Sequence, residues 1–145
     1  MLKCVVIATS VLFSLLSAAF ACSCIGHKTV EDHYASVDVI FRGVAKESRS
    51  DISDFGSTES MRWMVFRADE VLKGEVEHFD SVDVLYFHGN SGSCGLQLEE
   101  NQTYEVFASY DDKGRLRTGL CSGTRLSGQE VRWTWKDYRK VLSKY

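Results

Sequence analysis

The sequence predicts a single, mainly β domain: a closed or nearly closed barrel of five strands, with a short helical segment before it and an amphipathic helix after it. Three observations indicate this fold. Five stretches rich in apolar and β-branched residues are separated by clusters of Gly, Asp and Ser, which is typical of short strands joined by turns. The last apolar residues recur at helical spacing. The chain of 145 residues is long enough for one core and too short for two.

The first elements are a helical segment and a strand. We expect a helix over residues 29–35, with Thr29 as its N-cap and Asp32 three residues later, a spacing related to the capping box. Residues 37–45 are mostly apolar or β-branched and predict the first strand. The polar, Ser-rich residues 46–60 predict a long exposed loop. The loop either is solvated without a binding role or contacts a partner.

The remaining strands show alternating or near-continuous apolar patterns. They are predicted at residues 61–71, 81–87, 103–110 and 115–120. The Asp-Asp-Lys-Gly sequence at 111–114 has the composition of a hairpin turn between the last two. A strand count of five matches an OB-type barrel, whose closure removes exposed sheet edges.

The closing helix is predicted to begin at residues 127–130. Val131, Trp135, Tyr138 and Leu142 then fall at intervals that place them on one helical face, which we expect to pack against the barrel.

Composition and motifs argue against several functions. Seventeen basic and twenty acidic residues give a net charge of −3, which provides no basic surface for a nucleic acid. The chain has no Gly-x-Ser-x-Gly, no His-Glu-x-x-His and no phosphate-binding loop, so we expect no enzymatic activity and no cofactor. His27 and His33 lack the spacing of metal ligands. All four histidines, residues 27, 33, 78 and 88, are expected in surface or loop positions.

Residues 1–21 have the three parts of a secretory signal peptide. A basic residue near the start precedes an apolar run at residues 4–20, and Ala-Phe-Ala then places small residues at a cleavage site. The sequence therefore predicts a mature domain of residues 22–145 that is secreted to the extracellular space and has no membrane span. A second interpretation stays open, because bacterial lipoproteins also begin at a Cys, and lipid on Cys22 would anchor the protein to a membrane.

Cleavage before Cys22 changes the cysteine count from five to four. Cys22 and Cys24 are separated by one residue, a spacing at which a bond between the two is unfavourable. Each is expected to reach one of the two distant cysteines, Cys94 and Cys121, in an oxidising compartment. The spacing alone leaves open which pairs with which.

Four local motifs resemble one known family. Cys-Ser-Cys opens the predicted mature chain, Val-Asp-Val-Ile-Phe-Arg-Gly occupies 37–43, Ser-Cys-Gly occupies 93–95, and Leu-Cys follows the hairpin at 120–121. Together they resemble the N-terminal inhibitory domain of the tissue inhibitors of metalloproteinases, a netrin-like OB barrel. The resemblance spans nearly all of residues 22–145, although the third disulfide of that domain has no counterpart here.

The resemblance implies a disulfide pairing of Cys22 with Cys94 and of Cys24 with Cys121. Each bond would close a loop of more than seventy residues. Together the two bonds would hold the N-terminal end against the barrel. Chain ends are otherwise the most mobile parts of a domain.

The resemblance also implies an inhibitory site at Cys22. The α-amino nitrogen and carbonyl oxygen of Cys22 would chelate the catalytic zinc of a target protease, and Ser23 and Ser93 would contact the protease's pocket. The zinc would belong to the target, a secreted or membrane-bound metalloproteinase, and the inhibitor would act as a monomer. The alternative is a secreted netrin-like binding module without inhibitory activity. Asn101 begins an N-glycosylation sequon, which predicts a modification site in a eukaryotic host.

Overall fold

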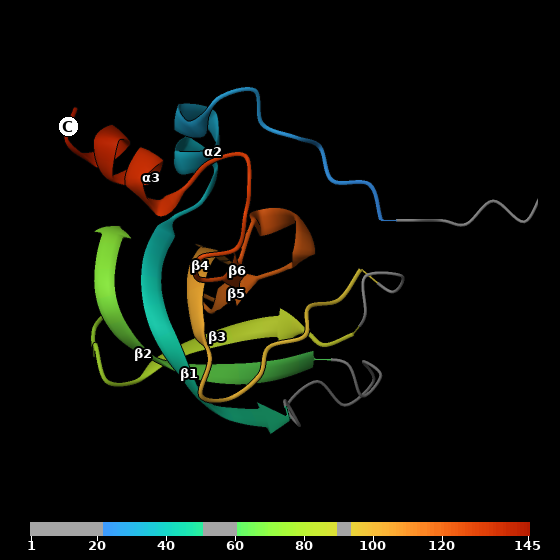
Figure 1. The fold of residues 1–145 in the computed structure, drawn as a ribbon. Helices are drawn as coiled ribbons and strands as arrows, with labels where there is room; N and C mark the ends of the chain where they lie inside the picture. Colours follow the sequence, from blue (N-terminus) through green and yellow to red (C-terminus); the bar gives the residue numbers. More distant parts are fainter. Residues whose placement is uncertain (1–21, 51–60, 90–93) are drawn as a thin grey trace, which may run out of the picture.

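A computed structural model shows the fold (Figure 1), and the structure describes residues 22–50, 61–89 and 94–145. The predicted signal peptide, residues 51–60 of the predicted loop and Ser93 lie outside the described residues. In chain order the elements are α2 (Val30–Ser36), β1 (Val39–Ser50), β2 (Met61–Lys73), β3 (Val82–Phe87), β4 (Thr103–Tyr110), β5 (Leu116–Thr118), the 3₁₀ helix η2 (Leu120–Ser122), β6 (Arg125–Leu126) and α3 (Trp135–Leu142).

The strands form the predicted barrel. They pair in the order β1-β2-β3-β5-β4-β6, and β1 also pairs with β4, which closes the first five strands on themselves. The β3–β5 pairing is parallel and all the others are antiparallel. The mainly β, five-stranded barrel is therefore confirmed. The short strand β6, which pairs with β4 beside the barrel, was not predicted.

The first strand is longer than the sequence predicted. The polar composition of residues 46–60 predicts a loop there, but residues 47–50 continue β1 and pair with residues 62–65 of β2. The register shifts along this pair, and one shift falls between Arg42 and Gly43. A Cβ on Gly43 would lie 2.5 Å from the carbonyl oxygen of Arg67, so only glycine lets the two strands approach this closely.

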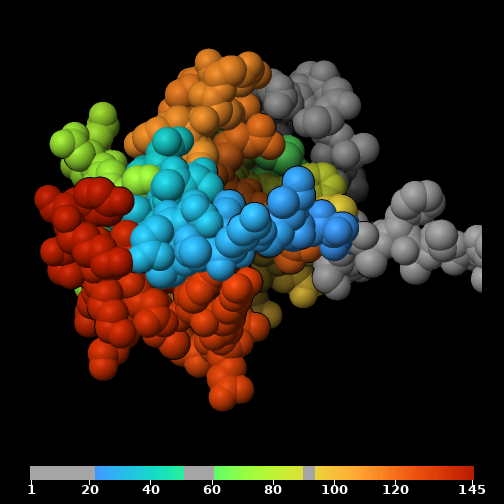
Figure 2. Space-filling view, turned by 90° about the horizontal axis from the view of Figure 1, so that it is seen from above, coloured from blue at the N-terminus to red at the C-terminus, as the bar shows by residue number. Residues whose placement is uncertain are grey.

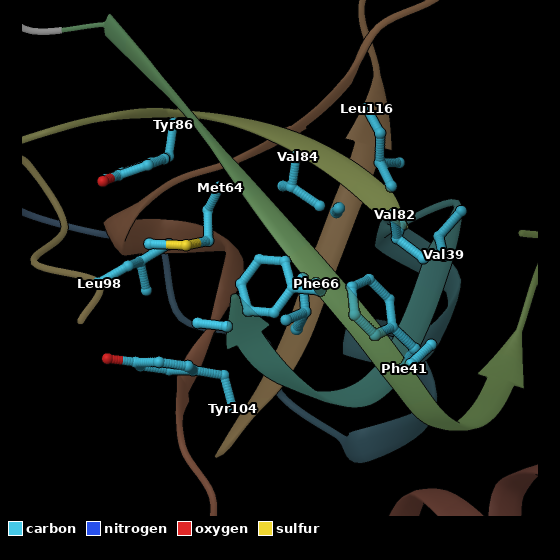
Figure 3. Close-up of a cluster of buried hydrophobic side chains, with 14 of the residues drawn as sticks. Val39, Phe41, Met64, Phe66, Val82, Val84, Tyr86, Leu98, Tyr104 and Leu116 are labelled. Carbon is cyan, nitrogen blue, oxygen red and sulfur yellow. The ribbon is translucent and has the colours of Figure 1, made fainter. Parts of the chain in front are cut away.

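The core fills the barrel interior with side chains from alternate strand positions (Figure 3). Phe66 packs edge-on against Phe41 and Tyr104, with ring centroids 5.5 and 6.1 Å away. The other core side chains labelled in Figure 3 are Val39, Met64, Val82, Val84, Tyr86, Leu98 and Leu116. Inward-facing and outward-facing residues alternate along the strands as the predicted patterns require.

The two helices lie side by side at one end of the barrel (Figure 1). The N-terminal one is confirmed: the Thr29 hydroxyl accepts from the Asp32 N–H at 3.1 Å, and the Asp32 carboxylate accepts from the Thr29 N–H at 3.2 Å. A second apolar cluster, between the helices and the outer face of the barrel, contains Val37, Ile40, Leu72, Phe107, Trp135 and Tyr138.

The C-terminal helix begins later than predicted. It starts at Trp135, because the Asp137 carboxylate accepts hydrogen bonds from the N–H and hydroxyl of Thr134, both at 2.8 Å, and so caps the helix there. Its buried residues are Trp135, Tyr138 and Val141, whereas Leu142, predicted on the same face, is 42% exposed. Within the described residues, no helix has the length and apolar character needed to cross a bilayer.

Glu70 on β2 attaches α3 to the barrel. Its carboxylate accepts two hydrogen bonds of 2.7 Å from Arg139 and one of 2.9 Å from the indole N–H of Trp135. Arg42 lies 3.1 Å away on the neighbouring strand. The Arg139 guanidinium, helped by Trp135 and Arg42, holds the pKa of Glu70 at about 2, against the opposing effect of its partial burial.

Candidate functional site

The N-terminal segment, residues 22–28, is an irregular stretch fastened to the barrel by two disulfides. Cys22 is bonded to Cys94, with Cα atoms 5.4 Å apart, and Cys24 to Cys121, with Cα atoms 5.2 Å apart. This is the pairing that the family resemblance implies. Figure 2 shows the segment in blue on the surface of the molecule, and its residues are half-buried or exposed.

Cys94 is positioned by a close contact between two stretches of backbone. The N–H of Leu96 donates to the carbonyl of Phe87 at 2.8 Å, and the N–H of Gly89 donates to the carbonyl of Leu96 at 3.1 Å. A Cβ on Gly95 would lie 2.5 Å from backbone atoms of Gly89, so glycine is required for this approach. The contact fixes Cys94 beside the end of β3. Ser93, the predicted pocket contact, lies outside the described part of the chain.

Cys121 is positioned by the 3₁₀ helix η2 and by buried hydroxyl groups around it. The Thr118 hydroxyl donates to the carbonyl of Phe107 at 2.7 Å, and the Thr124 hydroxyl accepts from the Phe107 N–H at 2.9 Å. Ser122, next to Cys121, lies 2.7 Å from the Thr118 hydroxyl. These bonds satisfy backbone groups of β4 and hold η2 against it.

His33 is buried, which corrects its predicted surface position. The residue is 5% exposed, with its Nδ1 2.6 Å from the Tyr138 hydroxyl and its Nε2 2.8 Å from the carbonyl oxygen of Ser122. It stacks between the rings of His27 and Phe107, each with its centroid 4.8 Å away. Burial lowers the pKa of His33, and the bond to the Ser122 carbonyl only partly opposes this effect.

Arg132 adds a third attachment for the segment. Its guanidinium donates to the carbonyl oxygens of His27 and Lys28, at 3.3 and 3.1 Å, and lies 4.8 Å from the centre of the Trp133 ring. The guanidinium thus lies over an aromatic face while it binds the backbone of the segment. Together with the disulfides and the His27–His33 stack, it fixes both ends of the segment.

The middle of the segment faces solvent. Ser23 is exposed, Cys22 is half-buried, and the side chain of Ile25 is 95% exposed. A cavity of about 220 Å³ opens beside it, and Ile25, Val131 and Trp133 contribute to its walls. The segment is thus an exposed stretch of backbone, fixed by two disulfides, next to a partly apolar hollow. A segment that is ordered in advance loses little entropy on binding.

The described residues contain no group of three or more His, Cys, Asp or Glu side chains that could hold a metal ion. The predicted glycosylation residue, Asn101, is exposed and has a φ of 65°, and its N–H donates to the carbonyl of Ala45 at 2.8 Å.

Comparison with known proteins identifies no relative: no family model matches the chain and no curated protein matches its sequence. The resemblance to the tissue inhibitors of metalloproteinases therefore depends on the quoted residues alone.

Sequence reasoning missed the side chains that hold the segment, chiefly His33 and Arg132. One signal for His33 was available. Val30, His33 and Val37 follow one another at intervals of three and four residues, so His33 lies on the face of α2 that also carries apolar residues packed on the barrel. For Arg132 the sequence carries no such signal, because its acceptors are carbonyl groups.

Proposed function

We propose that the protein is a secreted inhibitor of zinc metalloendopeptidases that acts through the backbone of Cys22. One observation carries this proposal: two disulfides fix Cys22 and Cys24 to separate parts of the barrel and leave Ser23 exposed between them. A terminus held in this way has already lost the freedom that binding would otherwise cost.

The proposed mechanism uses the open coordination position of a catalytic zinc. Such an ion has three protein ligands and a water molecule. After cleavage before Cys22, the α-amino nitrogen and the carbonyl oxygen of that residue could replace the water as a two-atom chelate. An α-amino group has a pKa of about 8, so zinc can bind its neutral form at modest cost near neutral pH. Ser23 and the loop before Cys94 would then contact the substrate pocket.

The experiment begins with the N-terminus of the secreted protein. Mass spectrometry and N-terminal sequencing should find a free amine on Cys22, whereas a lipid on its sulfur would support the anchored alternative. The processed protein is then assayed against a panel of zinc endopeptidases. A variant with one Ala before Cys22 should lose inhibition at least a hundredfold, about 2.7 kcal/mol of binding free energy, because an acylated nitrogen cannot bind zinc. The matched control carries one Ala after Tyr145.

Two results would contradict the mechanism: equal inhibition by the extended and processed forms, or no inhibition of any protease on the panel. The second result would favour the alternative, a netrin-like binding module. One observation supports that alternative, since the barrel has a separate cleft of about 510 Å³ with Trp63 and Tyr110 among its walls. If a partner bound the protein but left Cys22 open to chemical modification, this cleft would be the candidate surface for that partner.

A further inference from the structure

His33 connects three elements that are distant in sequence. It lies on α2, its Nδ1 meets Tyr138 of α3, and its Nε2 meets the carbonyl of Ser122 in η2. A carbonyl oxygen can only accept, so Nε2 must carry the proton that is donated to Ser122. Nδ1 is then an acceptor for the Tyr138 hydroxyl. One neutral tautomer therefore satisfies both bonds.

The ring has no room for another orientation. Its faces are covered by His27 and Phe107, with centroids at 4.8 Å on each side. At its edge, a Cβ on Gly123 would lie 2.6 Å from the ring carbon Cε1. The close fit holds His33 in the one position from which both nitrogens reach their partners.

A second proton on this ring is unfavourable for two reasons. It would turn Nδ1 into a donor facing the Tyr138 hydroxyl, whose own proton would lose its acceptor in a fully buried residue. It would also add a positive charge near Arg125, whose guanidinium lies 5.2 Å from the Phe107 ring and 5.8 Å from the Tyr138 ring. Glu105 is 2.7 Å from Arg125 and already pairs with it.

The remaining titratable neighbour offers no compensation. His27, stacked on the opposite face of the ring from Phe107, adds a further unfavourable charge interaction when both histidines are protonated. The groups that face His33 are thus the N-terminal segment's His27, β6's Arg125 with its partner Glu105 on β4, and α3's Tyr138.

We propose that His33 is the positioning residue of the N-terminal segment, and that acidification through the histidine range releases residues 25–28 from their packing on His33, while the two disulfides and the barrel stay intact. Release follows from the connectivity. Ser122 is next to Cys121, which is bonded to Cys24, and His27 packs directly on the His33 ring. Opening at His33 therefore loosens the segment at two points. The functional consequence, weaker inhibition in acid, depends on the function proposed above, but the release itself does not.

The sign follows from proton linkage. The closed state disfavours a protonated His33, whereas in an opened state the ring has its ordinary pKa of about 6.5. The opened state therefore binds more protons, and it gains on the closed state as the pH falls below that value. Its population should rise by up to tenfold for each pH unit until the pKa of the closed state is reached.

The test is amide hydrogen exchange on the oxidised protein, produced with its own leader, between pH 7.5 and 5.5. After correction for intrinsic rates, exchange at the hydrogen-bonded amides of His33 and Ser122, which donate to the carbonyls of Thr29 and Gly119, should increase roughly tenfold by pH 5.5, while the amides of β4 stay protected. Nitrogen NMR of the histidine rings should show His33 as the Nε2–H tautomer, with a pKa below the ordinary range. His33→Gln offers one donor and one acceptor without titrating, and should show no pH-dependent release.

The matched control is His27→Gln, which removes the other histidine of the stack and should keep the pH dependence. The inference is overturned if exchange at the amides of His33 and Ser122 is unchanged by pH in the native protein, or if His27→Gln abolishes the effect. If His33→Gln does not fold, the NMR titration and the control decide. Inhibition, measured in parallel, separates the two proposals. Release without inhibition at any pH refutes only the inhibitor, and pH-independent exchange in a working inhibitor refutes only the role of His33.

Discussion

Replacing Glu70 by glutamine should weaken the attachment of α3 to the barrel. Glutamine has the shape of a protonated glutamate, so the change removes the charge that faces Arg139 and Arg42 while keeping an acceptor for Trp135. The folded protein holds the pKa of Glu70 at about 2 instead of 4.5. At about 1.4 kcal/mol per pKa unit this corresponds to roughly 3 kcal/mol, and the exposure of part of the carboxylate to solvent reduces the expected loss to about 2 kcal/mol.

The sign of the pH dependence follows from the lowered pKa. The unfolded chain protonates Glu70 near pH 4.5 and the folded protein near pH 2, so this stabilisation is complete above pH 4.5 and is lost as the pH falls towards 2. Urea unfolding should therefore show a loss of about 2 kcal/mol for Glu70→Gln at pH 7 and less than half of that at pH 3. The exposed Glu77→Gln serves as control and should change little. An equal loss at both pH values, or a loss no larger than that of Glu77→Gln, would refute the reasoning.

Two further changes test the fold around the site. Gly43→Ala should lower the free energy of unfolding by roughly 2 kcal/mol, because its Cβ would collide with the carbonyl oxygen of Arg67; thermal unfolding with an unchanged midpoint would contradict the close approach of β1 and β2. The paired substitution Cys24→Ser with Cys121→Ser should cost up to about 4 to 5 kcal/mol, since it opens a loop of 97 residues. Urea unfolding measures that loss, and a variant as stable as the native protein would show that the barrel alone orders the segment.

Much of the fold could be predicted because the strands carry strong local patterns. Phe66 and Val84 lie in runs rich in apolar and β-branched residues whose alternate positions face the core, and the predicted strand at 103–110 matches β4 residue for residue. The end of β1 has no such pattern. Residues 47–50 are polar and form a strand through pairing with β2, a contact that periodicity within the segment cannot reveal.

The helix at the C-terminus shows a second kind of limit. Apolar spacing extends back to Val131 and predicts an earlier start, but the helix begins after the N-cap Thr134, whose N–H donates to the Asp137 carboxylate. His33 was missed for a different reason. Its partners Tyr138 and Ser122 are 105 and 89 residues away, so only the folded chain brings them together.

The two disulfides also impose an order on the making of the protein. A ribosome delivers Cys22 and Cys24 first, and their partners follow only after 72 and 97 further residues. Four thiols can pair in three ways. Cys22 and Cys24 are both present before either of their native partners has been synthesised. The second native bond, Cys24 with Cys121, can form only after β5 has been synthesised, so the native connectivity is complete only then. The N-terminal segment, which is synthesised first, is thus the last part to be fixed in place. The yield of correctly paired protein should depend on the thiol–disulfide exchange capacity of the compartment in which the chain folds.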